Sequence, residues 1–208
     1  RLLQDIVESH PSFRPAALNV GRLDIQQGHL DAADRGSNEL MLQAPEDPQL
    51  LREAARLSIA RGNRAEALRF LESAVTRDPA AIKPNLALIE LYLEGGQYDR
   101  ALQTALNLES RRPLNVQARL ALAKSRLANR QQALALDELT KAARLAQGNP
   151  RQLAAVALVQ IDAKDRKAAE ANLEAALEQD PTLSSARLVL ARLVAGNGQL
   201  DRAASHVE

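Results

Sequence analysis

The chain has 208 residues and a formal net charge of +1, from 27 Lys and Arg against 26 Asp and Glu. This balance gives no overall field that would draw the chain to nucleic acid or to an acidic membrane surface. Hydrophobic residues make up 46% of the sequence but aromatic residues only 2%, so we expect closely packed helices with an interior of alanine and leucine. The absence of cysteine excludes disulfides and cysteine metal sites.

Three residue types recur with one spacing of 34 residues. Alanine does so six times, at Ala33, Ala67, Ala101, Ala135, Ala169 and Ala203. Proline follows the same spacing at Pro11, Pro45, Pro79, Pro113 and Pro181, with Gln147 in its place once. Glycine occurs at Gly28, Gly62, Gly96 and Gly198, with Arg130 and Lys164 at the other two positions. A strict period of this length predicts a repeat array rather than one globular core.

In chain order, residues 1–13 read as the second helix of a truncated repeat. Five units follow at 14–47, 48–81, 82–115, 116–149 and 150–183, and a partial unit at 184–208 completes one solenoid domain. Each unit carries two helical patterns of about a dozen residues joined by a short turn. Since the pattern begins and ends within helices, we expect the chain to be a fragment of a larger protein.

The turn and boundary residues have physical reasons for their places. Glycine ends the first helix of a unit because it adopts a left-handed conformation without steric cost. Arg130 and Lys164 therefore predict strained turns that cost about 1 kcal/mol each. At the fifth boundary we expect Asn149 to cap the next helix and Pro150 to occupy its first turn.

The recurring alanine lies one turn into each second helix, where we expect that helix to cross the first one most closely. A facing row of small residues supports this crossing: Gly21, Ala55, Ala123, Ala157 and Ala191, with Ile89 as the one exception. Larger side chains at such a crossing would push the two helices apart.

These three ladders in one register resemble the tetratricopeptide repeat, a helix-turn-helix unit of this length. The resemblance implies an all-α, right-handed α-α superhelix of about six repeats, whose first helices line a concave groove that binds peptides or partner proteins. Tyr92 is the only tyrosine at the family's usual place, and tryptophan is absent. In composition the chain is also similar to alanine- and arginine-rich repeat proteins of the bacterial envelope that serve exopolysaccharide assembly, including those associated with PEP-CTERM sorting.

If first helices line a groove, the spacing places nine residues on it. They are Arg22, Arg56, Glu90, Lys124, Leu158 and Arg192 in one row, with Arg52, Lys83 and Arg151 one turn away. Such a basic stripe would receive an acidic peptide, a C-terminal carboxylate or an anionic polysaccharide. The alternative is that these are ordinary solvated side chains on a helix face.

The first helix of the fifth unit is apolar on nearly every side. Ala154, Leu158 and Ile161 would form a hydrophobic docking patch if they are exposed, and core if a neighbouring unit covers them. The sequence leaves both alternatives open.

Catalytic and metal-binding patterns are missing. His10, His29 and His206 are far apart, and no HExxH, GxSxG or phosphate-loop motif occurs. We therefore predict no enzyme activity, no cofactor and no metal. Four aromatic residues provide no stacking platform for nucleic acid, and the longest apolar run, 153–159, is too short to span a membrane.

The sequence thus predicts a non-enzymatic scaffold that binds a protein or peptide partner, as part of a larger bacterial protein. Two alternatives remain: an envelope component of exopolysaccharide assembly or export, and a regulatory repeat domain of an attached enzyme or sensor. A periplasmic or outer-membrane-associated location is favoured over the cytoplasm.

Overall fold

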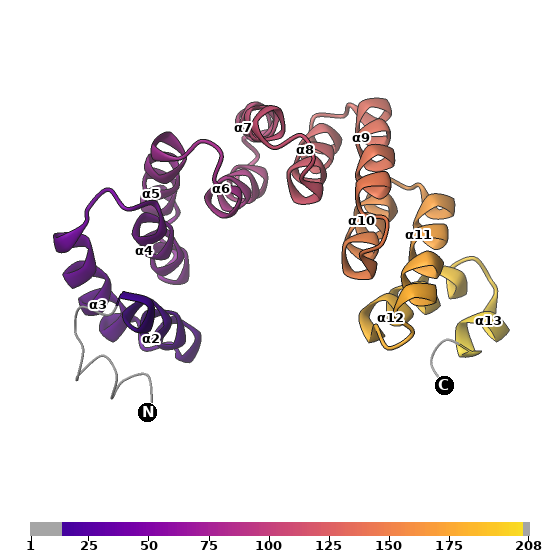
Figure 1. Ribbon diagram of the computed structural model, residues 1–208, viewed down its shortest axis with the longest axis horizontal. Coiled ribbons are helices and arrows are strands. Elements are labelled where there is room, and N and C mark those ends of the chain that lie inside the picture. Colours follow the sequence, from indigo (N-terminus) through magenta and orange to yellow (C-terminus); the bar gives the residue numbers. More distant parts are fainter. Residues whose placement is uncertain (1–13, 206–208) are drawn as a thin grey trace. The chain divides into compact units, whose positions relative to one another are not determined.

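The computed structural model describes residues 14–205, which form twelve helices and no strand (Figure 1). The predicted helix within residues 1–13 lies outside the described part of the chain. The described chain divides into two compact units, the first ending at Gly95 and the second beginning at Gly96.

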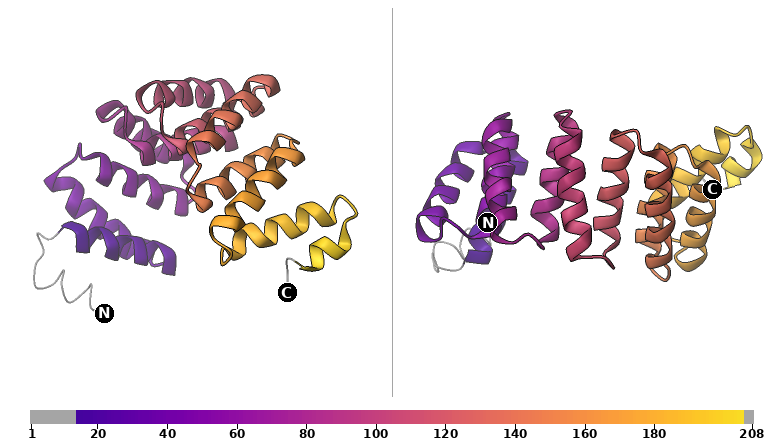
Figure 2. Two further views of the ribbon diagram at one scale, coloured as in Figure 1. Left: turned by 45° about the vertical axis from the view of Figure 1, so that its right-hand side comes forward. Right: turned by 90° about the horizontal axis from the view of Figure 1, so that it is seen from above.

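The first unit contains five helices, and neighbours in sequence pack against each other (Figure 2). They are α2 (Arg14–Gln27), α3 (Leu30–Gln43), α4 (Pro48–Ala60), α5 (Arg64–Arg77) and α6 (Ile82–Glu94). The first helices α2 and α4 also contact each other. Leu50, Leu57, Leu71 and Leu88 are among the buried side chains of this unit.

The second unit contains seven helices with the same order of neighbours. They are α7 (Tyr98–Arg111), α8 (Val116–Ala128), α9 (Gln132–Leu145), α10 (Pro150–Asp162), α11 (Arg166–Gln179), α12 (Ser184–Ala195) and α13 (Leu200–Ser205). Its first helices α8, α10 and α12 contact one another in sequence. The prediction of an all-α fold of helix-turn-helix repeats is confirmed.

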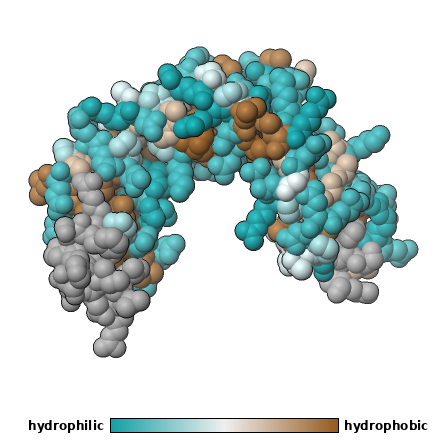
Figure 3. All heavy atoms as spheres, viewed as in Figure 1, coloured by the Kyte–Doolittle hydropathy of each residue, from teal (hydrophilic) through white to brown (hydrophobic). Residues whose placement is uncertain are grey.

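Apolar side chains fill the spaces between these helices. In the second unit one buried cluster includes Leu139, Leu153 and Val156, and another includes Leu173 and Leu190. The surface drawn in Figure 3 is correspondingly largely hydrophilic, with smaller hydrophobic areas between. Burial of these leucines and valines is the main favourable term for the fold.

The recurring alanines are buried as their spacing predicts. Five of them, Ala33, Ala67, Ala101, Ala135 and Ala169, are at most 2% exposed, and only Ala203 in the last helix is partly exposed. On the first helices, Ala55, Ala123 and Ala157 are completely buried. Small residues on both sides let the paired helices approach closely.

Polar side chains cap the helices where the sequence supplies them. Asn149 accepts a hydrogen bond from the backbone N–H of Gln152 at 3.1 Å, and Pro150 occupies the first position of α10. The predicted start of this helix is therefore confirmed. The same capping bond is made by Asp47, Asn63, Asn115 and Asp165 at the starts of α4, α5, α8 and α11.

The turns between paired helices are left-handed. The ladder glycines have φ between 69° and 81°, and the two substitutes, Arg130 and Lys164, have φ of 58° and 62°. A side chain in this region meets its own backbone, which costs about 1–2 kcal/mol relative to the right-handed region. The structure confirms that these two residues occupy strained turns.

Replacing Lys164 by glycine should therefore stabilise the protein by about 0.5–1 kcal/mol, because relief of strain exceeds the extra freedom of glycine in the unfolded chain. Urea unfolding followed by circular dichroism would measure the change. Lys167→Gly is the matched control, since Lys167 lies exposed inside α11 and should lose about 1 kcal/mol. Equal effects at both positions would contradict the strain argument.

Candidate functional site

A cleft of about 1030 Å³ lies in the first unit where the first turns of α2, α4 and α6 come together. Three of the predicted groove residues line it, Arg22 from α2, Arg52 from α4 and Lys83 from α6. Asp47 and Asp78 also line it. The cleft therefore presents three cations and two carboxylates.

The two carboxylates are placed by the backbone. Asp47 is the cap of α4, and its Oδ1 accepts the backbone N–H of Gln49 at 2.8 Å. Asp78 follows α5, and its Oδ1 accepts the backbone N–H of Ala80 at 3.1 Å. Since both have backbone duties, we expect the cations to dominate recognition of a ligand.

A buried glutamate holds the arginines of this cleft. Glu53 is 8% exposed, and its Oε1 lies 2.7 Å from Nη2 of Arg22 and 2.7 Å from Nη2 of Arg52. Its other oxygen, Oε2, lies 3.6 Å from Nη1 of Arg56. Three arginines from two helices thus share one carboxylate, which leaves the cluster with two uncompensated positive charges.

These charges affect one another. The hydrogen bond with Glu53 raises the pKa of Arg22. Burial lowers the pKa of Arg52, and the like charges of Arg22 and Arg56 lower it further against the attraction of Glu53. Among residues 14–205, buried Nε of Arg22 and buried Oε2 of Glu53 have no hydrogen-bond partner. Both features indicate a cluster that an added anion would stabilise.

The predicted groove members of the first unit therefore differ in their surroundings. Arg22, Arg52 and Arg56 are bound to Glu53 and are not freely solvated side chains. Lys83 is exposed and makes no hydrogen bond or ion pair with any described residue. Glu90 is exposed on α6 but does not line the cleft.

In the second unit the predicted groove residues are exposed and unpaired. Lys124, Arg151 and Arg192 lie on α8, α10 and α12, and within the described chain none of them makes a hydrogen bond or ion pair. Leu158 is 48% exposed on α10. The cations of this unit are thus available to a partner, whereas the arginines of the first unit are tied to Glu53.

The predicted apolar patch on α10 is wrong in part. Ala154 is buried in the cluster that includes Leu190, and Ile161 packs against the same cluster. The following pair of helices, α11 and α12, covers them. Only Leu158 of the three is exposed.

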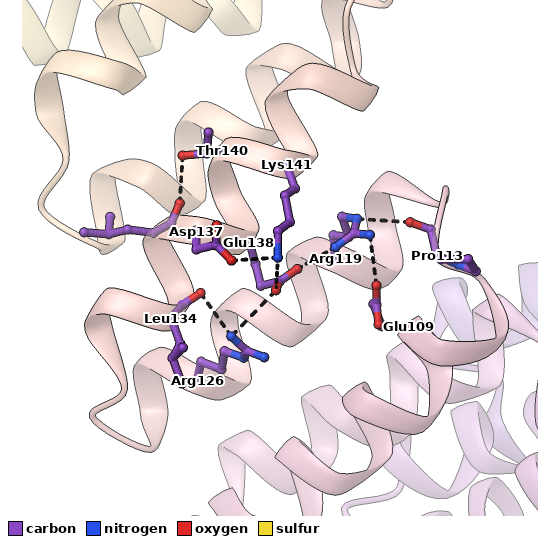
Figure 4. A network of polar contacts seen from close by, with 10 residues as sticks. Glu109, Pro113, Arg119, Arg126, Leu134, Asp137, Glu138, Thr140 and Lys141 are labelled. Carbon is purple, nitrogen blue, oxygen red and sulfur yellow. Dashed lines mark hydrogen bonds and ion pairs between the residues drawn. The ribbon is translucent and has the colours of Figure 1, made fainter.

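A second buried carboxylate, Glu138 on α9, lies at the centre of a polar network in the second unit (Figure 4). Its oxygens lie 2.7 Å from Arg119, 3.2 Å from Lys141 and 3.6 Å from Arg126. Arg119 also contacts Glu109 at 3.0 Å and donates to the carbonyl oxygen of Pro113. Since each cation of this network has a further partner, we assign it a structural role.

Sequence analysis missed Glu53 and Glu138, although the period contains a signal for the first. The row spaced by 34 residues through Glu53 reads Asn19, Glu53, Ala87, Ala121, Ala155 and Val189. A glutamate among alanines marks a position where a buried charge needs a partner. The row through Glu138 is mixed and carries no such signal.

Metal and catalytic chemistry gain no support from residues 14–205. No group of three or more His, Asp or Glu residues there could hold a metal ion. His29 is exposed, with Nδ1 3.8 Å from Oδ1 of Asp24. His10 and His206 lie outside the described residues.

Family models match the chain over most of its length. One tetratricopeptide repeat model matches residues 58–109 and 160–208, and a second tetratricopeptide repeat model matches residues 86–150. Together they cover well over half of the sequence and agree with the helix pairs. The chain belongs to the tetratricopeptide repeat family.

Solved structures show the same tetratricopeptide fold. A thermophilic protein of this family from Thermus thermophilus matches with a TM-score of 0.66 and 22% identity, over 86% of this chain and 97% of that one. A tetratricopeptide repeat protein from Parabacteroides merdae matches with a TM-score of 0.70 and 15% identity, over 98% and 81% of the chains. At these identities the likeness shows the fold.

A third match is the APC/C hetero-tetramer Cut9–Hcn1, with a TM-score of 0.66 and 17% identity. It covers 98% of this chain but 40% of that one. No curated protein matches significantly. Within residues 14–205 of this tetratricopeptide chain, no helix is both long and apolar enough to cross a membrane.

Proposed function

We propose that this tetratricopeptide chain is a non-enzymatic scaffold that binds an acidic peptide or protein segment in the cleft of the first unit. The observation that carries the proposal is the gathering of Arg22, Arg52 and Lys83 around one cleft of about 1030 Å³. The likeness in fold to Cut9, which is part of a hetero-tetramer, agrees with a role in protein assembly.

The arginines are held in place before a ligand arrives. Because Arg22 and Arg52 already share Oε1 of Glu53, they lose little side-chain freedom when they bind a further carboxylate. Their remaining N–H groups and the ammonium group of Lys83 are the donors for the ligand. An acidic segment would order on a prepared surface.

Reversal of one charge in the cleft tests this proposal. Lys83→Glu should weaken binding of a fluorescein-labelled octaglutamate peptide about tenfold, because attraction is replaced by repulsion. Lys83 is suitable since it is exposed and takes part in no ion pair of the described fold. Fluorescence anisotropy would measure the dissociation constant at low and at physiological salt.

Arg69→Glu is the matched control, because it makes the same charge change at an exposed position of α5 outside the cleft. It should change the affinity less than twofold if the cleft is the binding site. Equal losses in the two variants would reject the cleft.

An anionic polysaccharide is the second candidate ligand, because its uronate carboxylates would meet the same three cations. This ligand would agree with the predicted role in exopolysaccharide assembly. Oligogalacturonate of matched charge tests it in the same assay, and tighter binding than that of the peptide would favour the polysaccharide. A regulatory role beside an attached enzyme stays a prediction from the sequence.

A further inference from the structure

Two half-exposed leucines lie on neighbouring first helices of the second unit. Leu158 on α10 is 48% exposed and Leu188 on α12 is 50% exposed. These two helices contact each other. Val189, next to Leu188, packs against the core cluster beneath. Apolar surface is therefore available on a face where the family fold places no further helix of the described chain.

The repeat relates this place to the ion cluster of the first unit. Leu158, Leu188 and Val189 stand at the repeat positions of Arg22, Arg52 and Glu53, each moved by four periods of 34 residues. In the first unit the side chains at these positions meet, with both arginines 2.7 Å from Glu53. Since α10 and α12 pack as α2 and α4 do, the two leucines flank Val189 in one patch. An ionic cluster is thus replaced by an apolar one.

Unpaired cations surround the patch. Arg192 follows Leu188 by four residues and Arg151 precedes Leu158 by seven, so both lie on the same helix faces as the leucines. Lys124 on α8 stands at the repeat position of Leu158, one period earlier. None of the three cations makes a hydrogen bond or ion pair in the described chain. On α8, α10 and α12 the only carboxylate is Asp162, at the end of α10.

We propose that this apolar-basic face, formed by Leu158, Leu188, Lys124, Arg151 and Arg192, docks a peptide segment that carries two apolar side chains flanked by carboxylates. The leucines supply contact area, and the cations select and orient an acidic segment. Charge complementarity decides the partner, because three cations without an ion-pair partner in the described chain would repel a basic one. The proposal lies wholly in the second unit and does not need the cleft of the first.

A random dodecapeptide library displayed on phage, selected against the whole chain, tests the partner chemistry. Peptides enriched on the wild-type protein should combine Leu, Ile or Phe with Asp or Glu. After synthesis, their affinity for the Leu158→Ser/Leu188→Ser variant should fall about tenfold or more, as for central residues of an interface. Thermal melts of each variant verify that it is folded.

Two controls separate this face from other surfaces. Leu114→Ser removes a leucine that is 79% exposed elsewhere in the second unit and should leave the affinity unchanged. Arg192→Glu should weaken the same peptides about tenfold, whereas Lys167→Glu on the outer helix α11 should not.

Several results would overturn the proposal. They are a selection without enriched peptides, enriched peptides that lack acidic residues, and affinities that survive the double serine change. Peptides that respond to Lys83→Glu alone would support the cleft of the first unit and reject this face. Loss in the double serine variant with no response to Lys83→Glu would support this face and reject the cleft.

Discussion

Replacing Glu138 by alanine is expected to destabilise the second unit by about 3 kcal/mol, near the lower end of the cost of breaking a buried ion pair. Glu138 is 4% exposed, and its carboxylate accepts from Arg119 at 2.7 Å and from Lys141 at 3.2 Å. Without it, these cations and Arg126 would lie close together around an empty position. The loss stays near the lower end because each of them keeps another partner.

Asp137→Ala is the matched control for this change. Asp137 is the neighbouring residue on α9 and pairs with Lys141 at 2.6 Å, but it is exposed. Ion pairs at the surface contribute little because water solvates both partners, so this change should have a small effect. Urea unfolding, combined with hydrogen exchange of α8 and α9, would measure both variants. Equal destabilisation by the two changes would show that burial of Glu138 does not matter.

Replacing Ala169 by leucine should also destabilise the second unit, by about 1–3 kcal/mol, because the larger side chain overpacks a filled interface. Ala169 is completely buried and shares a cluster with Ala157 of α10 and Leu173 of α11. Added carbon atoms would force α10 and α11 apart or move their side chains from preferred rotamers.

The control for this change is Ala171→Leu, two residues further along α11 and exposed. Alanine and leucine have similar helix propensities, so this variant should stay within about 0.5 kcal/mol of the wild type. Guanidinium unfolding gives both values. A small effect at Ala169, equal to that at Ala171, would mean that the helix crossing has room for a larger side chain.

Much of the fold was predictable because a period of 34 residues constrains every unit in the same way. Ala135 and Ala169 are buried where the spacing requires a close crossing, and Asn149 caps α10 as its place before Pro150 indicates. Left-handed turns at Arg130 and Lys164 were also predictable, since the ladder puts them at glycine positions. Such features depend on local geometry, which the sequence carries directly.

The candidate binding surfaces were predictable only in part. Spacing correctly brings Arg22, Arg52 and Lys83 to one place, because first helices of successive repeats lie side by side. It does not show that Glu53 neutralises part of that charge, since the contact between Arg22 and Glu53 joins residues 31 apart on different helices. The exposure predicted for Ala154 failed for a related reason, because the covering helices belong to the next repeat.

The sequence by itself therefore determined the family, the helix-turn-helix repeats, the buried alanines and the residues on the first-helix faces. Only the tertiary structure decided which of those residues are free. Arg22 and Arg52 are tied to Glu53, whereas Lys124 and Arg192 have no such partner among the described residues. The physical reason is that ion pairing and burial depend on distances between neighbouring helices. A spacing along one chain fixes the face on which a side chain lies but not the partner it meets.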